Sequence, residues 1–297
     1  MSGLHRRDVL VASLATAGAL ACPQPSRASE TLQIAGLNVT VWRPPGAGKA
    51  VPTIVFSHGF HGCAAQSGFL LQAIAAAGYL VIAPDHADAS CGSGHASPTD
   101  PPEQAFNEPA AWNEATYRGR ADDIKHLIDA LRTDPSWNGR IDWARLGLAG
   151  YSLGGYTMLG LTGAWPSWRI GGAKAVLALA PYLQPFLVGR TLGGLTVPVM
   201  YQGGTLDTDI NPWLGKPKGA YETSPAPKYY VEMQGASHIA WTDMQPVDHA
   251  TIVRYSVAFL NRYVSGNSRS VLPRRSGDVA TMRWSDAPAP SRPGHAS

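Results

Sequence analysis

Three short stretches of this chain carry a hydroxyl, a carboxylate and an imidazole in an order that suits nucleophilic catalysis. Their reactive residues are Ser152, Asp207 and His238. A serine hydroxyl is a weak nucleophile at neutral pH, so it needs a histidine as base and a carboxylate that orients the histidine. We therefore predict a catalytic triad in which Ser152 is the nucleophile, His238 the base and Asp207 the acid. Asp209 is the alternative acid in the same loop.

The nucleophile candidate lies in Gly150-Tyr151-Ser152-Leu153-Gly154, which fits the G-x-S-x-G pattern of a nucleophile elbow. A strand passes close to a helix at such an elbow, and glycine on both sides of the serine avoids a collision between them. The apolar run 144–149 predicts the strand, and residues 156–161 predict the helix. For this segment alone, the alternative is an ordinary strand-to-helix turn.

Acyl transfer to a serine also needs N–H donors for the negative oxygen of the tetrahedral intermediate. One donor is the backbone N–H of the residue after the nucleophile, which is Leu153. The second comes from the loop after an earlier strand, where we choose the N–H of Phe60. His58 and His61 lie in the same loop, but no carboxylate accompanies them at ligand spacing, so we predict no metal site.

Apolar runs alternate with segments of helical spacing through most of the chain. This alternation predicts an α/β fold with a mainly parallel sheet and helices on both of its faces. Residues 31–43 are expected to form an antiparallel edge of the sheet. The predicted buried strands span 52–56, 79–83, 144–149, 173–179, 197–201 and 228–233, and the predicted helices span 67–77, 110–131, 156–161 and 248–264.

Each triad candidate lies within a few residues of the carboxyl end of a predicted strand. Parallel strands end at the same edge of a sheet, and open α/β sheets bind their ligands at that edge. We therefore expect Ser152, Asp207 and His238 to meet there.

The distribution of charge argues against a nucleic-acid partner. The whole chain of 297 residues has a formal net charge of +3. Residues 29–265, however, contain 16 Lys and Arg against 18 Asp and Glu, so the basic excess lies at the two ends of the chain. The predicted domain therefore lacks the basic surface that binding to a phosphate backbone requires.

The first residues have the pattern of an export signal. Arg6-Arg7 precedes the apolar run 9–21, which is too short to span a bilayer comfortably and resembles a twin-arginine signal. Ser26-Arg27-Ala28 places small residues where a signal peptidase reads, so we predict that residues 1–28 are removed. Lipid attachment at Cys22 is the alternative. Either route leads to a periplasmic or secreted protein without a transmembrane segment in the mature chain.

Two cysteines remain in the mature chain, Cys63 and Cys91, and each lies in a loop after a predicted strand. The loops of neighbouring parallel strands emerge at one edge, and export removes the reducing environment that keeps thiols free. We therefore predict a disulfide between them. Residues 266–297 are rich in Ser, Arg and Pro and lack apolar periodicity, which predicts a disordered tail.

Four motifs stand out within residues 31–265: His58-Gly59-Phe60, Gly150-Tyr151-Ser152-Leu153-Gly154-Gly155, Gly204-Thr205-Leu206-Asp207 and Gly235-Ala236-Ser237-His238. Together they resemble the α/β-hydrolase superfamily. The chain is most similar there to bacterial dienelactone-hydrolase-related and platelet-activating-factor-acetylhydrolase-like esterases, and to cutinase-like polyester hydrolases. Dienelactone hydrolases use a cysteine where this chain has Ser152, which favours ordinary esters over lactones.

The resemblance implies a serine esterase that works through an acyl-enzyme and needs no cofactor. Its substrate would be a small or polymeric ester. A peptidase or acyltransferase on the same triad is one alternative, and a catalytically silent binding protein is another. Residues 86–111, residues 181–195 and Trp213 or Trp241 are the candidates for lining an acyl pocket.

Overall fold

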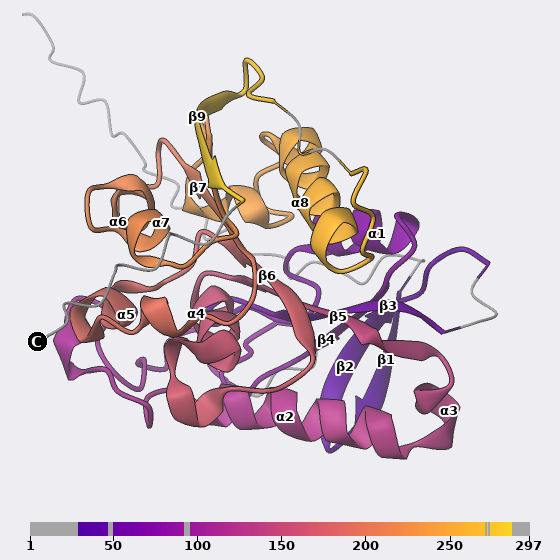
Figure 1. The fold of residues 1–297 in the computed structure, drawn as a ribbon. Coiled ribbons are helices and arrows are strands. Elements are labelled where there is room, and N and C mark those ends of the chain that lie inside the picture. Colours follow the sequence, from indigo (N-terminus) through magenta and orange to yellow (C-terminus); the bar gives the residue numbers. More distant parts are fainter. Residues whose placement is uncertain (1–28, 47–49, 92–95, 271, 273, 287–297) are drawn as a thin grey trace, which may run out of the picture.

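The computed structural model describes residues 29–46, 50–91, 96–270, 272 and 274–286. The predicted export signal, with its cleavage site after Ala28 and the alternative lipid site at Cys22, lies outside the described residues. The described part of the chain forms one twisted sheet with helices packed on both sides (Figure 1). No helix within these ranges is long and apolar enough to cross a membrane.

The sheet has the strand order β1-β2-β4-β3-β5-β6-β7-β8-β9. Its centre, from β4 through β3 to β8, is parallel, whereas β1, β2 and β9 pair antiparallel at the two ends. This arrangement confirms the predicted α/β class and the antiparallel edge. The strands are β1 (Ser29–Ile34), β2 (Leu37–Trp42), β3 (Val51–Ser57), β4 (Leu80–Pro84), β5 (Ile141–Tyr151), β6 (Ala173–Leu179), β7 (Val199–Gly204), β8 (Lys228–Met233) and β9 (Val279–Ser285).

Helices cover both faces of the sheet, which explains why the central strands are apolar throughout rather than alternating. On β6, Leu177 packs against the layer that holds α1 and α8, while its neighbours Val176 and Ala178 face the layer of α2, α4 and α5. Figure 1 shows α1 beside α8 on one side and α2 along the other. The helices are α1 (Gly68–Ala76), α2 (Arg118–Thr133), α3 (Pro135–Asn138), α4 (Leu153–Leu159), α5 (Gln184–Gly189), α6 (Asn211–Gly215), α7 (Ala220–Thr223) and α8 (His249–Tyr263).

The helix expected from residue 110 begins later, at Arg118. Residues 109–111 form a separate 3-10 turn, and Tyr117 has a left-handed backbone with φ of 58°. The Tyr117 N–H donates to the carboxylate of Glu103, and the Trp112 indole N–H donates to the carbonyl of Ala105. These bonds hold residues 103–117 as a folded loop over the start of α2, a tertiary arrangement that helical spacing alone does not reveal.

The expectation that residues 266–297 lack regular structure is wrong for Val279–Ser285. These residues form β9, which pairs antiparallel with β8 and extends the sheet. Val279 is 1% exposed and Leu272 is 8% exposed, so both side chains belong to the core around α8. A strand at the edge of a sheet is stabilised by backbone hydrogen bonds and a few buried side chains, and it therefore needs no long apolar pattern.

Candidate active site

Ser152 occupies a sharp turn between β5 and α4 with φ of 53°, a region that residues other than glycine rarely adopt. The flanking glycines are required by close approach. A Cβ atom on Gly150 would lie 2.3 Å from the carbonyl oxygen of Gly154, and one on Gly154 would lie 1.9 Å from that of Ser57. The chain therefore has the strand–turn–helix geometry expected of an elbow, and the end of β3 packs directly against it.

The structure brings the three residues predicted as a triad into one hydrogen-bonded row. The Nε2 atom of His238 lies 3.0 Å from Ser152 Oγ, and its Nδ1 atom lies 2.7 Å from Asp207 Oδ2. The Asp207 side chain is 2% exposed, and its other oxygen accepts the backbone N–H of Ile210 at 3.1 Å. Asp209 is exposed and has no contact of this kind with His238, so the geometry favours Asp207 over Asp209.

The surroundings of His238 select one tautomer and one orientation of its ring. An ionised carboxylate only accepts hydrogen bonds, so Nδ1 carries the proton toward Asp207 and Nε2 is left to accept the Ser152 hydroxyl proton. The Tyr151 hydroxyl donates to the backbone carbonyl of His238 at 3.0 Å. Burial, with a contribution from the charge of Asp207, raises the pKa of Tyr151 far above its usual range, so this hydroxyl remains a donor. The role of Tyr151 was not predicted from the sequence.

The two predicted oxyanion donors lie on segments that touch each other. Leu153 begins α4, and Phe60 lies in the loop between β3 and α1. A Cβ atom on Gly59 would lie 2.9 Å from the ring of Tyr151, and one on Gly154 would lie 2.7 Å from the carbonyl oxygen of His58. The loop that carries Phe60 is therefore packed against the residues on either side of Ser152.

Aromatic side chains surround the Phe60 side of the site. The Phe106 ring lies 5.4 Å from the Phe60 ring and 5.0 Å from that of Tyr182, both edge to face. The Tyr182 N–H donates to the carbonyl of Ser152 at 3.0 Å, which fixes this tyrosine beside the elbow. Phe106 comes from the segment 86–111 and Tyr182 from the segment 181–195, both proposed above for the acyl pocket, whereas Phe60 belongs to the loop between β3 and α1.

Neither tryptophan proposed for that pocket forms a ring contact with Phe60, Phe106 or Tyr182. Trp241 is fully buried in the core beneath α8, and its indole N–H donates to Gln202 Oε1 at 3.1 Å. Trp213 lies on α6, where the ammonium group of Lys216 sits 3.2 Å from the centre of its ring.

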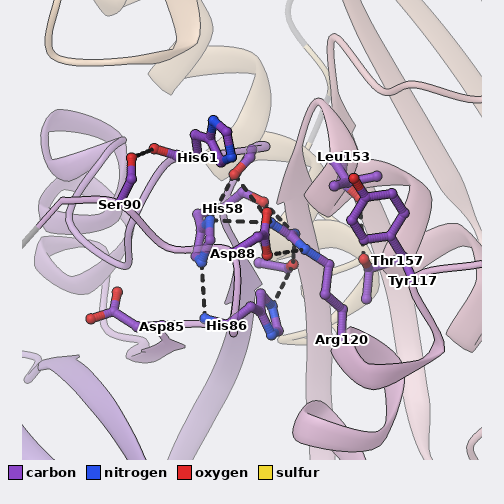
Figure 2. Close-up of polar contacts among 12 residues, drawn as sticks. His58, His61, Asp85, His86, Asp88, Ser90, Tyr117, Arg120, Leu153 and Thr157 are labelled. Carbon is purple, nitrogen blue, oxygen red and sulfur yellow. Dashed lines mark hydrogen bonds and ion pairs between the residues drawn. The ribbon is translucent and has the colours of Figure 1, made fainter. Parts of the chain in front are cut away.

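The loop that carries Phe60 contacts a cluster of polar residues formed by the buried side chains of His58, His86 and Arg120 and by the half-buried Asp88 (Figure 2). Burial and the adjacent Arg120 charge lower the pKa of both histidines well below the usual value. Both imidazoles are therefore neutral at neutral pH. No group of three or more His, Cys, Asp or Glu side chains placed to hold a metal occurs within the described ranges.

The Cys63–Cys91 disulfide is present, with Cα atoms 5.5 Å apart, which confirms the prediction from the sequence. It joins the loop between β3 and α1 to the loop that follows β4. Cys63 lies three residues after Phe60. The bridge therefore ties the loop of a proposed oxyanion donor to the neighbouring strand's loop.

The strand order, the elbow and the side chains that meet at the carboxyl edge define an α/β-hydrolase fold. The sequence profile of a PETase family described as PET hydrolase-like matches residues 15–272, and the chain belongs to this family.

Three relatives illustrate the similarity. Cutinase est2 of Thermobifida alba is 29% identical over 229 residues, covering 76% of this chain and 64% of that protein. Cutinase 1 of Thermobifida cellulosilytica is 28% identical over 227 residues, covering 76% and 73%. A bis(hydroxyethyl) terephthalate hydrolase of Streptomyces coelicolor is 28% identical over 173 residues, covering 56% and 51%. The chain thus spans less than two thirds of the length of the first of these relatives.

Proposed function

We propose that this protein is a serine hydrolase of carboxylic esters, with Ser152 as nucleophile, His238 as general base and acid, and Asp207 as the orienting carboxylate. The single observation that carries the proposal is the continuous row of hydrogen bonds from Ser152 Oγ through His238 to the buried Asp207. Membership of the PET hydrolase-like family supports it.

In the first half of the reaction, Ser152 Oγ attacks the carbonyl carbon of the ester while His238 Nε2 takes the hydroxyl proton. The carbonyl oxygen becomes negative and accepts the N–H groups of Leu153 and Phe60. The tetrahedral intermediate collapses, the bond to the alcohol oxygen breaks, and the imidazolium returns its proton to the leaving alcohol. Asp207 stabilises the imidazolium that forms between these steps.

In the second half, water replaces the alcohol. His238 Nε2 takes a proton from the water as its oxygen attacks the acyl-enzyme carbonyl. The second tetrahedral intermediate then collapses with cleavage of the bond to Ser152 Oγ, which regains its proton from the imidazolium. The products are the free acid and the original enzyme, so no cofactor is consumed.

For the substrate we propose esters with an apolar or aromatic acyl group, in small molecules or in polymers. The half-buried rings of Phe60 and Phe106, packed on the buried ring of Tyr182, provide an apolar surface beside the nucleophile. Relatives named cutinase and bis(hydroxyethyl) terephthalate hydrolase support the same substrate class. We further propose that the protein is exported, because its disulfide suits an oxidising compartment and residues 1–28 have the pattern of a signal.

The test combines an active-site label with a substrate panel. A fluorophosphonate should label the mature chain, residues 29–297, and should not label Ser152→Ala. The variant should lose at least about a thousandfold in kcat on p-nitrophenyl esters, because the members of a triad act as a unit. Ser136→Ala, at an exposed serine of α3, is the matched control and should behave as wild type.

Three outcomes would contradict the proposal. Near-normal turnover by Ser152→Ala would remove the nucleophile assignment. Absence of labelling in the folded wild type would indicate a silent binding protein. Labelling without ester turnover, together with cleavage of peptides or transfer of acyl groups to other alcohols, would indicate a peptidase or an acyltransferase.

A further inference from the structure

The N–H of Phe60 and the carbonyl of Gly59 belong to the same peptide unit. A peptide unit is planar, and in the trans form its N–H and C=O point in opposite directions. Whatever fixes the direction of the Gly59 carbonyl therefore also fixes the direction of the Phe60 N–H.

Three donors converge on the Gly59 carbonyl oxygen. Arg120 Nη2 lies 3.1 Å away, His58 Nδ1 lies 2.7 Å away, and the backbone nitrogen of Gly62 lies 3.0 Å away. Since a carbonyl only accepts, His58 carries its proton on Nδ1. Its Nε2 atom then accepts the backbone N–H of His86 at 3.0 Å. His58 and the Gly62 amide belong to the loop after β3 itself, whereas Arg120 reaches this loop from α2.

Arg120 holds the preceding residue as well. Its Nη1 atom donates to the His58 carbonyl at 2.7 Å and approaches Ser57 Oγ at 3.3 Å. One guanidinium group thus bridges two consecutive carbonyls at the end of β3. Its planar fork of donors suits this arrangement, which the single ammonium of a lysine does not reproduce.

The guanidinium itself is held in place by Asp88. Arg120 is 3% exposed, and its Nε and Nη2 atoms donate to the two carboxylate oxygens at 2.9 and 2.7 Å. Burial alone would raise the pKa of Asp88, but the charge and hydrogen bonds of Arg120 outweigh it and hold that pKa well below its usual range. Asp88 is therefore ionised at neutral pH, and it fixes the guanidinium from one side while the other side binds the loop.

The remaining polar groups of the cluster complete the same network. Ser57 Oγ lies 2.9 Å from His86 Nε2, and His86 Nδ1 lies 2.8 Å from Asp123 Oδ2. With His86 neutral, Nδ1 donates to the carboxylate and Nε2 accepts the Ser57 hydroxyl proton. Ser57 can then accept from Arg120. The donors and acceptors agree from Asp123 through His86 and Ser57 to Arg120, as a buried polar network requires. Arg120 Nη2 also lies 3.3 Å from His58 Nδ1, but both atoms are donors and both are directed to the Gly59 carbonyl.

We propose that Arg120 is a positioning residue for the oxyanion hole, acting through the Gly59–Phe60 peptide unit. This inference rests on the proposed function, in which the Phe60 N–H binds the oxyanion. By binding the Gly59 carbonyl, the guanidinium fixes the plane of the peptide and polarises its N–H toward the substrate. Arg120 does not touch substrate in this scheme, and its effect is confined to the charge that develops on the carbonyl oxygen.

The test compares Arg120→Lys with Arg118→Lys, a matched control on the same helix whose side chain is 43% exposed and pairs with Asp122. We expect Arg120→Lys to lower kcat about 10- to 100-fold on a p-nitrophenyl ester, because misalignment of an oxyanion donor weakens transition-state binding. KM should stay within about twofold. The affinity for a trifluoromethyl ketone, which forms a tetrahedral adduct with serine, should fall by about the same factor as kcat/KM.

A purely structural role would lower the melting temperature without this selective loss. If folded Arg120→Lys keeps the kcat and the inhibitor affinity of Arg118→Lys, the proposal is overturned. Should Arg120→Lys fail to fold, Asp88→Asn decides, because it loosens the guanidinium without removing it. For Asp88→Asn we expect a smaller fall in kcat/KM than for Arg120→Lys, with the affinity for the trifluoromethyl ketone falling by the same factor as kcat/KM. If Asp88→Asn weakens the binding of substrate and of inhibitor equally, the proposal is overturned.

Hydrogen–deuterium exchange separates this inference from the esterase assignment. Peptides that cover residues 57–62 should exchange faster in Arg120→Lys than in Arg118→Lys, whether or not the protein hydrolyses esters. An inactive, unlabelled wild type would overturn the proposed function and the oxyanion role with it. An active wild type with unchanged exchange and kinetics in Arg120→Lys would overturn only the inference.

Discussion

Two aspartates two residues apart in the loop after β7 are distinguished by their surroundings. The Asp207 carboxylate is almost fully buried and receives the proton-bearing nitrogen of His238, whereas Asp209 is exposed. An amide at position 207 would present an N–H to His238 and favour the wrong tautomer. We predict that Asp207→Asn lowers kcat by roughly a thousandfold or more and that Asp209→Asn leaves kcat within about twofold.

Steady-state kinetics of both variants on one p-nitrophenyl ester check this prediction. The melting temperature of each variant shows whether a loss of activity reflects unfolding. A larger fall in kcat for Asp209→Asn than for Asp207→Asn would move the proposed acid to position 209.

That Ser152, Asp207 and His238 lie together could be predicted because each is marked by its local sequence. Contacts within a few ångströms of Ser152 require glycine at positions 150 and 154, so the G-x-S-x-G pattern is visible in five residues. No local sequence pattern of this kind surrounds Arg120. It lies on α2 among apolar residues that pack on the sheet, and its partners come from the loop that follows β3 and from the loop after β4. Only the folded chain brings these segments together.

At the scale of elements, the Cys63–Cys91 bridge connects two loops at the carboxyl edge of the sheet. It spans a sequence separation of 28 residues. On the chain-entropy model, a loop of this size stabilises the folded state by about 3–4 kcal/mol. We predict that Cys63→Ala/Cys91→Ala lowers the free energy of unfolding by about this amount. We also expect a severalfold lower kcat, because the loop that holds Phe60 loses its tether.

Urea unfolding of the mature protein with and without a thiol reductant provides the measurement. Reductant should destabilise the wild type and leave the double variant unchanged. Equal stability of the two proteins under oxidising conditions would show that the bridge does not stabilise the fold.

The elements most readily predicted were those with long buried runs. The central strands and α8 follow directly from apolar runs and helical spacing, because both faces of the sheet are covered. The start of α2 differs from the prediction because hydrogen bonds shape the loop 103–117, from the Tyr117 N–H to the Glu103 carboxylate and from the Trp112 indole to the Ala105 carbonyl, and periodicity does not. The strand β9 was missed because its stability comes from pairing with β8.

At the scale of the whole molecule, the buried histidines couple stability to pH. Burial, reinforced by the charge of Arg120, lowers the pKa of His86 well below its usual value. In the unfolded chain a histidine titrates near pH 6.5. Below that pH the unfolded chain binds a proton that folded His86 does not, so this residue contributes less to stability as the pH falls. Asp123 acts in the opposite sense, because burial raises its pKa to about 6 and it takes up a proton in the folded state.

Comparison with a variant isolates the histidine from the other titrating groups. In His86→Asn, an amide can donate to Asp123 and accept from Ser57 but does not titrate. We predict that wild type has a larger free energy of unfolding than His86→Asn at pH 8. This difference should shrink by about 1.4 kcal/mol at pH 5.5, which is one pH unit below the pKa of histidine in the unfolded chain. Urea unfolding at both pH values gives the difference, and an advantage that is constant or grows in acid would contradict the assignment of a neutral, buried His86.

The last strand decides whether the C-terminal region matters to the fold. The absence of apolar periodicity in residues 266–297 predicts that its removal is silent, but β9 reverses this prediction. Without residues 279–297, β8 would become an open edge, and the core would lose the side chain of Val279, which is 1% exposed. Burial of one valine contributes about 1.5–3 kcal/mol, and each kcal/mol corresponds to about 2–4 °C for a domain of this size.

We therefore expect a chain ending at Asp278 to melt roughly 3–12 °C below a chain ending at Asp286, which retains β9 and serves as the matched control. The shortened chain should also associate, because an open edge strand can pair with a second molecule. Differential scanning calorimetry and size-exclusion chromatography measure the two effects. Equal melting temperatures would show that β9 adds no net stability, and the sheet would then be held together by its parallel core and the helices on its two faces.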